Sequence, residues 1–172
     1  VSINGCYHGH TGFAVSTGDP IFKDPFLAQG EPGCFVQVPL DDLDAMENEL
    51  KKGDVAAVII ESILATYGFK IPAPGYLKAV KELCEKYGTL YIADEVQTGL
   101  MRTGKMWSID HEGFIPDMLV TAKGFSGGMY PIACTVLNRK AAAWLFEAGR
   151  MHGSTTGGSE VGCMVCLLYT SD

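Results

Sequence analysis

Short apolar runs alternate with amphipathic segments along most of the chain. The apolar runs predict strands at 34–38, 55–61, 89–93, 118–121 and 131–137. The amphipathic segments predict helices at 41–52, 75–87 and 139–148. Asp41 or Asp42 is expected to cap the first helix, and Gly53 and Gly88 stand where the first two helices should end. The chain is therefore predicted to alternate strands and helices.

This alternation is typical of an α/β protein, in which right-handed crossovers pack helices against a layered sheet. The run at 55–61 (VAAVIIE) is apolar almost throughout, as expected of a strand that is buried on both faces. Ligands of such sheets bind beyond the carboxyl ends of the strands. The polar residues that follow predicted strands should therefore converge on one pocket: Glu61, Asp94 with Glu95, and Lys123.

The composition is that of one globular domain. The chain has 172 residues, of which 47% are hydrophobic and 19% are charged, and its formal net charge is −7. This charge disfavours nucleic acid and anionic lipid as partners, and no apolar run reaches the ~18 residues that a membrane-spanning helix needs. The six cysteines are scattered, which favours a reducing cytoplasm over a secreted disulfide scaffold. The chain begins at Val1 in a loop rich in Gly and His, and we interpret it as an internal piece of a longer protein.

Lys123 and Asp94 are the main candidates for chemistry. Lys123 follows a predicted strand and precedes a Gly-rich loop, where partial desolvation would favour a neutral, nucleophilic amine; a solvated loop lysine is the alternative. Asp94 follows a buried strand, where a carboxylate could bind a metal with Glu95, orient a histidine or pair with a pyridinium nitrogen. Pyridoxal 5′-phosphate (PLP) chemistry needs both a lysine and an acidic partner for the ring nitrogen, so the pairing favours the pyridinium.

Several segments, in register from Tyr7 to about Cys163, resemble the class III (ω-amino acid) branch of the fold-type I PLP-dependent aminotransferases. The matching segments are Tyr7-His8-Gly9, Val58-Ile59-Ile60-Glu61, Asp94-Glu95-Val96-Gln97-Thr98-Gly99 with Arg102-Thr103-Gly104, Pro116-Asp117 leading to Ala122-Lys123-Gly124, and His152-Gly153-Ser154-Thr155 with Gly157-Gly158. The resemblance implies a three-layer α/β sandwich with a mainly parallel sheet, as in the large domain of that fold.

The resemblance also implies a ring site. Lys123 matches the lysine that forms a Schiff base with PLP, and Asp94 matches the aspartate that pairs with the pyridinium nitrogen. Tyr7 matches the aromatic residue stacked on one ring face, and Val96 matches the aliphatic residue packed on the other. Gln97 matches the residue near the phenolic oxygen of the ring.

Three more residues are implied around that ring. His8 belongs to the same motif as Tyr7 and is expected among the cofactor-binding residues. Thr155 matches the threonine that reaches the phosphate bound by the neighbouring subunit, so a homodimer is implied. Glu61 matches a pocket glutamate that pairs with an arginine of the carboxy-terminal domain, and without that partner a buried Glu61 would be destabilising. No metal is implied.

The implied activity is transfer of an amino group from an ω-amine or amino acid to a 2-oxo acid, both small molecules, with PLP as cofactor. Residues 1–166 are expected to form part of the PLP-binding large domain, and residues 167–172 a tail outside the family pattern. The amino-terminal phosphate loop and the small carboxy-terminal domain of the family are missing, so we expect these residues alone to be inactive. Residues 62–68 depart from the family's usual Pro and Gln-Gly-Glu-Gly-Gly-like loop, and 159–160 from its Asn-Pro, so donor and acceptor are not identified.

Other interpretations stay open. Racemases and mutases of the same fold use the same lysine. Gly124-Phe125-Ser126-Gly127-Gly128 matches G-x-S-x-G, the nucleophile elbow of α/β hydrolases, but such an elbow leads into a helix and a strand is predicted here. The chain could also be a non-catalytic piece that does not close a pocket.

Overall fold

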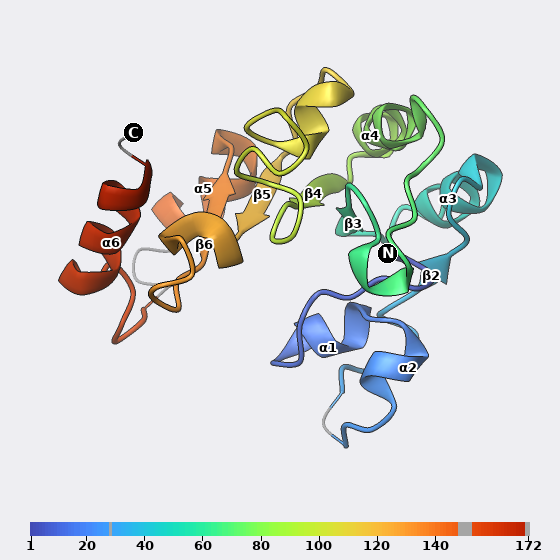
Figure 1. Cartoon of the computed structure of the whole chain (residues 1–172). Helices are drawn as coiled ribbons and strands as arrows, with labels where there is room; N and C mark the ends of the chain where they lie inside the picture. The colour runs from blue at the N-terminus through green and yellow to red at the C-terminus, as the bar shows by residue number, and fades with distance from the viewer. Residues whose placement is uncertain (28, 148–152, 171–172) are drawn as a thin grey trace.

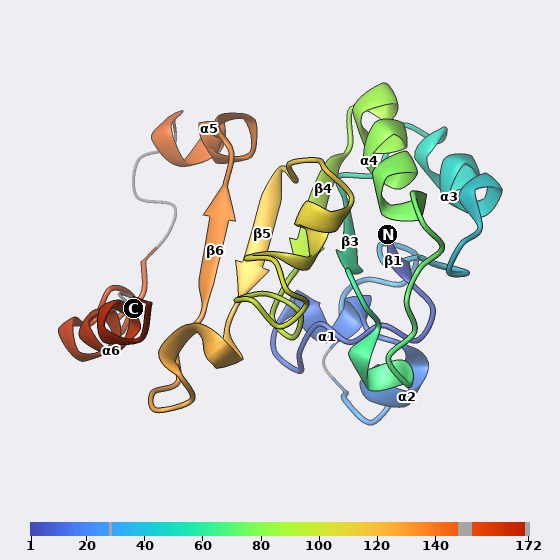
Figure 2. The same cartoon turned by 45° about the horizontal axis from the view of Figure 1, so that its top comes forward.

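A four-stranded sheet forms the centre of the computed structural model, which describes residues 1–27, 29–147 and 153–170. The strands are β3 (Ala57–Glu61), β4 (Leu90–Asp94), β5 (Met118–Thr121) and β6 (Cys134–Leu137), in that order across the sheet. The first three are parallel and β6 is antiparallel to β5. The arrowheads of β3 and β5 point toward α1 (Phe13–Thr17), and that of β6 points the opposite way (Figures 1 and 2). The predicted α/β class with a mainly parallel sheet is confirmed.

Two helices cover one face of this sheet. Helix α3 (Leu43–Leu50) begins at Asp42, whose side chain accepts a hydrogen bond of 2.8 Å from Ala45 N, as expected of an N-cap. Helix α4 (Tyr76–Tyr87) ends at Gly88, which adopts a left-handed conformation with φ of 73°. The two helices pack against each other and against the sheet (Figure 2).

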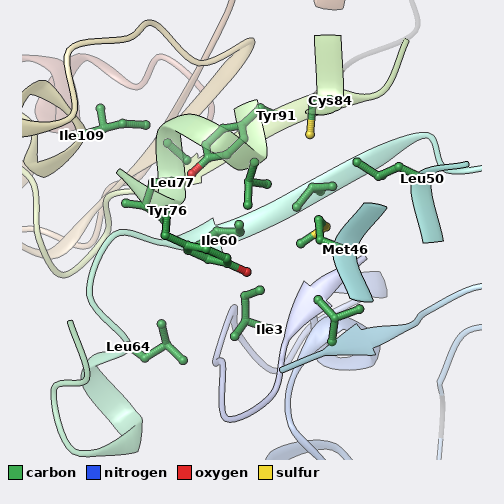
Figure 3. Close-up of a cluster of buried hydrophobic side chains, with 14 residues drawn as sticks. Ile3, Met46, Leu50, Ile60, Leu64, Tyr76, Leu77, Cys84, Tyr91 and Ile109 are labelled. Atoms are coloured by element: carbon green, nitrogen blue, oxygen red, sulfur yellow. The ribbon is translucent and has the colours of Figure 1, made fainter. Parts of the chain in front are cut away.

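The hydrophobic core lies between these helices and the sheet (Figure 3). Every second residue of β3 and β4 points into it, because side chains alternate across a strand. The central members are fully buried: Met46, Leu50, Val58, Ile60, Val80, Cys84, Tyr91 and Ala93. At about 1.5–3 kcal/mol for each large apolar side chain, this cluster is the main source of stability.

The residues of the opposite face are only partly buried by the described chain. Ile59, Ile92 and Val120 lie on that face and remain partly exposed. The expectation that residues 55–61 are buried on both faces is therefore wrong for the described residues. The partly exposed face instead lines a cavity, described below.

The remaining elements lie around the sheet ends. A parallel pair, β1 (Ser2–Ile3) with β2 (Gln37–Val38), is joined to β3 by hydrogen bonds from Val1 N to Ala57 O and from Ile59 N to Val1 O. The others are α2 (Pro20–Lys23), η1 (Ala65–Tyr67), η2 (Ser108–His111), η3 (Lys123–Ser126), α5 (Arg139–Glu147) and α6 (Glu160–Thr170). Helix α6 extends through Thr170, so residues 167–170 of the expected tail continue it. Among the described helices, none has the length and apolar character needed to cross a membrane.

A buried ion pair fastens α4 to the amino end of β5. Lys81 Nζ lies 2.8 Å from Asp117 Oδ2, and the Asp117 carboxylate also accepts hydrogen bonds from Tyr91 N and Asn138 Nδ2. Burial opposes the negative charge of Asp117, but Lys81 and these donors outweigh it and lower the pKa of the carboxyl group. The pair thus ties α4, β4, β5 and the residue after β6 together, at the end of the sheet remote from the site.

Candidate active site

Two carboxylates end neighbouring strands. Glu61 is the last residue of β3 and Asp94 the last residue of β4, and the two are partners in the sheet register. Asp94 is in turn the register partner of Val120 on β5. Residues in register on adjacent strands share a face, so Glu61, Asp94 and Val120 lie on the same side of the sheet.

Asp94 forms a buried pair with His8. The distance from His8 Nδ1 to Asp94 Oδ2 is 2.7 Å, and the side chains are 1% and 9% exposed. Burial of the imidazole opposes its positive charge, but the hydrogen bond to Asp94 outweighs this and raises the pKa of His8 to about 10. Asp94 Oδ1 accepts a second hydrogen bond, of 3.1 Å, from Val96 N. The carboxylate is therefore fixed in orientation from both sides.

A cavity of about 770 Å³ opens beside this pair. Its walls include His8, Asp94, Val96 and Val120. Where Val96, Val120 and Asp94 form the wall, apolar side chains lie beside one oriented carboxylate. This part of the wall suits a flat, aromatic, nitrogen-containing ring, which needs a carboxylate at its nitrogen and apolar contact on its faces. The residues present therefore fit the ring of PLP.

Tyr7 lies next to His8 and is held by Glu61. The Tyr7 N–H donates a 2.8 Å hydrogen bond to Glu61 Oε1, and its ring packs edge-on against Phe22 with centroids 5.2 Å apart. Glu61 Oε2 accepts another hydrogen bond, of 3.3 Å, from Ala65 N. Glu61 thus accepts two backbone hydrogen bonds in these residues, and it links the loop of Tyr7 to the loop after β3.

The charge of Glu61 is affected mainly by its burial. Glu61 is 5% exposed, and burial raises the pKa of its carboxyl group, although the Tyr7 N–H and the positive His8 act in the opposite direction. The like charge of Asp94 raises this pKa further. The charge of Glu61 therefore interacts with the charges of both His8 and Asp94.

Lys123 is the first residue of η3 and is separated from the end of β5 by Ala122 alone. Its Nζ donates a hydrogen bond to Gln97 Oε1, which joins two residues 26 positions apart. Its backbone is left-handed, with φ of 49°, a conformation that non-glycine residues rarely adopt. The side chain is exposed, so the expected partial desolvation is wrong for the described residues.

Lys123 and Asp94 are not in direct contact. Lys123 lines a second cavity, of about 630 Å³, together with Ala122 and residues 128–133, whereas Asp94 lines the first. Gln97 connects the two regions, because it lies in the turn that follows Asp94 and binds Lys123. The structure thus brings together His8 with Asp94, Tyr7 with Glu61, and Gln97 with Lys123.

Thr155 is separate from these groups. It is exposed, in a turn where Ser154 Oγ accepts a 3.0 Å hydrogen bond from Gly157 N. Helix α6, which follows this turn, packs on η3 through a 3.0 Å hydrogen bond from Cys166 Sγ to Phe125 O. His152, part of the same motif, lies outside the described residues.

Glu95 does not join the pocket, contrary to the sequence prediction. It is 1% exposed and lies on the opposite side of the chain from Asp94, as the alternation of side chains along a strand requires. Four hydrogen-bond donors surround its carboxylate: Ser62 Oγ, Thr98 Oγ1, Ser108 N and Ile109 N. A carboxylate so occupied does not fit a metal site shared with Asp94. Sequence reasoning missed this role, since nothing in the spacing shows where the donors come from.

Ser126 does not have the environment of a hydrolase nucleophile. It is 1% exposed, and its Oγ donates to Tyr130 O and accepts from Tyr130 N within its own loop. The chain then continues into β6 instead of a helix. The geometry disagrees with the elbow of an α/β hydrolase.

Comparison with known proteins places the chain in one family. The model of the family "Aminotransferase class-III" matches residues 1–169. An uncharacterized aminotransferase of Archaeoglobus fulgidus is 48% identical over 163 residues, which are 94% of this chain and 37% of the relative.

Solved structures show the same relationship. The ornithine aminotransferase of Toxoplasma gondii superposes with a TM-score of 0.89 at 36% identity, covering 98% of this chain and 39% of that one, and it carries PLP in partial occupancy at its active site. An (S)-enantioselective omega-transaminase of Thermomicrobium roseum superposes with a TM-score of 0.89 at 29% identity. The match covers 99% of this chain and 43% of the transaminase.

The chain thus spans 37% of the length of the curated relative, and members of the family use PLP. On these matches, the chain belongs to the class-III aminotransferases.

Proposed function

We propose that the complete protein is a PLP-dependent aminotransferase that moves an amino group from an ω-amine or amino acid to a 2-oxo acid. The observation that carries this proposal is the buried His8–Asp94 pair at the end of β4, with Gln97 of the next turn bound to Lys123. In this arrangement Asp94 offers a carboxylate to a ring nitrogen, and Lys123 offers an amine to an aldehyde carbon. The short turn that contains Gln97 connects the two residues.

When bound, PLP supplies an electron sink for the charge left on a substrate carbon after its proton is removed. Asp94 is proposed to accept a hydrogen bond from the ring nitrogen and to favour its protonated form. His8 supports this role because its positive charge and its hydrogen bond keep the Asp94 carboxylate in place. Val96 and Tyr7 are proposed to contact the two ring faces, and Val96 lines the cavity beside Asp94.

Lys123 is proposed to hold the cofactor at its aldehyde carbon, with loss of water. Once a substrate amine has displaced it, the free Lys123 Nζ would accept the proton of the substrate carbon and return it to the cofactor carbon. Gln97 Oε1 accepts a hydrogen bond from Lys123 Nζ, which supports a role for Gln97 in directing the amine and in binding the ring's phenolic oxygen. The exposure of Lys123 in the described residues leaves its Nζ accessible to an incoming aldehyde.

The nature of the substrates and the assembly are also proposals. The names of two similar structures, an ornithine aminotransferase and an omega-transaminase, favour a donor with a terminal amino group. The exposed Thr155 is proposed to reach the phosphate of a neighbouring subunit, which requires a homodimer. A cytoplasmic location, and a tail at 167–172 outside the PLP-binding domain of 1–166, likewise stay predictions.

Borohydride reduction tests the lysine. Reduction of the protein incubated with PLP should fix the cofactor on Lys123, and peptide mapping should find the added mass there. Lys123→Arg, which keeps the charge but cannot form the bond, should lose the label. Label on Lys70 or Lys86 in the unsubstituted protein would show that another lysine holds the cofactor.

A turnover assay tests the reaction class and the competence of the 172 residues. The complete protein should convert ω-amines in the presence of pyruvate or 2-oxoglutarate. We propose that residues 1–172 alone do not, because Thr155 would serve a second subunit and the site would lack its phosphate loop. Absorbance at about 400 nm after incubation with PLP would show whether these residues still bond the cofactor. Turnover by residues 1–172 at the rate of the complete protein would refute this part of the proposal.

A further inference from the structure

We propose that Glu95 is a positioning residue for the cofactor ring, which acts by fixing the turn that carries Asp94 at one end and Gln97 in the middle. This inference rests on the proposed function, because the two residues it positions are those proposed to bind the nitrogen edge and the oxygen edge of PLP. Glu95 itself lies on the other side of the chain and is not expected to touch the ring.

The carboxylate of Glu95 joins its own turn to two other segments of the chain. Ser62 Oγ, directly after β3, donates to Glu95 Oε1 over 2.8 Å. Thr98 Oγ1, in the turn after β4, donates to Oε2 over 2.5 Å. The backbone N–H groups of Ile109 and Ser108, at the start of η2, donate to Oε1 and Oε2 over 2.8 and 3.1 Å. All are buried contacts.

The same turn determines the orientation of Asp94. Asp94 Oδ1 accepts a hydrogen bond from Val96 N, so the side chain follows the position of the turn backbone. The turn is closed by a 2.9 Å hydrogen bond from Gly99 N to Glu95 O. A Cβ on Gly99 would lie 2.8 Å from Glu95 O and from the Trp107 ring, so the turn is packed tightly between the two. Movement of Glu95 would therefore move Val96 and Gln97.

The pattern of donors makes Glu95 hard to replace. Each oxygen of the carboxylate accepts one hydroxyl group and one backbone N–H. A glutamine has one oxygen and one NH₂ group, so in either orientation the NH₂ would face a backbone N–H. A hydroxyl can rotate to accept instead of donate, but a backbone N–H cannot. Only a carboxyl group offers an oxygen acceptor to each of the two backbone N–H groups.

Glu95→Gln tests the proposal in the complete protein. The amides of Val96 and of Ser108 or Ile109 should exchange hydrogen about tenfold faster or more, because a buried donor loses its acceptor. The dissociation constant for PLP should also rise about tenfold or more, because the turn would no longer hold Asp94 and Gln97 in position for the ring. The pH at which the absorbance of bound cofactor changes should also shift, since Asp94 would be displaced from the ring nitrogen. An effect on folding alone would not shift that titration.

Matched variants keep the test decisive if Glu95→Gln fails to fold. Thr98→Val has the shape of threonine without the hydroxyl, and Thr98→Ser keeps the hydroxyl. We expect Thr98→Val to weaken PLP binding and Thr98→Ser to bind PLP as the unsubstituted protein does. Glu82→Gln makes the same chemical change on an exposed residue of α4 and should change none of the measurements.

The outcomes separate this inference from the proposed function. Unchanged amide exchange, PLP affinity and titration in Glu95→Gln would overturn the role of Glu95 and leave the aminotransferase proposal intact. Equal PLP affinities of Thr98→Val and Thr98→Ser would likewise overturn the role of Glu95 without affecting the aminotransferase proposal. If the unsubstituted protein binds no PLP, the proposed function fails, and the exchange rate of the Val96 amide still decides whether Glu95 fixes the turn.

Discussion

His8 Nδ1 lies 2.7 Å from Asp94 Oδ2, although the two residues are 86 positions apart in the chain. The pair joins a loop at the start of the chain to the carboxyl end of β4 and is almost fully excluded from solvent. The hydrogen bond to this buried imidazole fixes the position of the Asp94 carboxylate. Its contribution to stability therefore has a defined dependence on pH.

Stability should fall in alkaline solution because of this pair. The pKa of His8 is about 10 in the folded chain against an ordinary value of 6.5. Because the folded pKa is the higher one, the stabilisation is complete below pH 6.5 and is lost as the pH rises through about 10. Its size should be on the order of a few kcal/mol.

Chemical denaturation between pH 6 and pH 10 measures this effect. The free energy of unfolding of the unsubstituted protein should decline across the interval more steeply than that of His8→Gln. His111→Gln, a substitution at an exposed histidine, should follow the unsubstituted protein. Parallel curves for His8→Gln and the unsubstituted protein would rule out a raised pKa for His8.

Asp94→Asn should separate cofactor binding from turnover. The amide keeps the shape of the side chain but carries no charge, so it cannot favour the protonated ring nitrogen. We expect the rate of transamination to fall about 10²-fold or more, as when a preorganised charge is removed from an active site. Asp24→Asn, at an exposed position, is the control in the same assay. A near-normal rate for Asp94→Asn would exclude the proposed role.

The Lys81–Asp117 pair predicts unequal effects of its two deletions. Asp117→Leu should destabilise the protein by about 3–5 kcal/mol, because it removes the acceptor of two further donors and leaves the buried Lys81 only its exposed partner Glu85. Lys81→Met should lower the free energy of unfolding by less, since Tyr91 N and Asn138 Nδ2 still donate hydrogen bonds to Asp117. Glu85→Gln, which affects only the exposed end of the network, should change stability by about 1 kcal/mol or less. Urea unfolding of the three variants gives the order, and equal costs for Asp117→Leu and Lys81→Met would contradict this account.

A serine-directed phosphonate should not label the protein. Ser126 is buried and hydrogen-bonded within its own loop, so its hydroxyl is neither accessible nor activated. Mass spectrometry of the treated protein should find no adduct, and Ser126→Ala should retain aminotransferase activity if it folds. An adduct on Ser126 would revive the hydrolase interpretation.

The sequence pattern predicted the central strands well, because their side chains are buried by neighbours that the pattern also reveals. The strand predicted at 118–121 matches β5, and that at 89–93 differs from β4 by one residue at each end. The strand predicted at 34–38 shrinks to Gln37–Val38, since only these residues have a partner, in β1. Apolar content alone cannot show where a backbone finds its hydrogen bonds.

The site was predictable only as far as the strand ends determine it. The register that places Glu61 beside Asp94 follows from the parallel pairing of their strands. The contacts of Glu61 with Tyr7 N and of Glu95 with Ser108 N depend on the paths of loops, which have no periodic pattern. The exposure of Lys123 likewise depends on which other segments cover the loop.

The left-handed backbone of Lys123 has a consequence for redesign of the protein. With φ of 49°, a side chain at this position costs about 1–2 kcal/mol, a penalty that glycine avoids. A procedure that ranks substitutions by thermal stability alone would therefore favour Lys123→Gly and would remove the amine that is proposed to bond the cofactor. Position 123 is thus a place where the fold would be more stable without the residue that the proposed function requires.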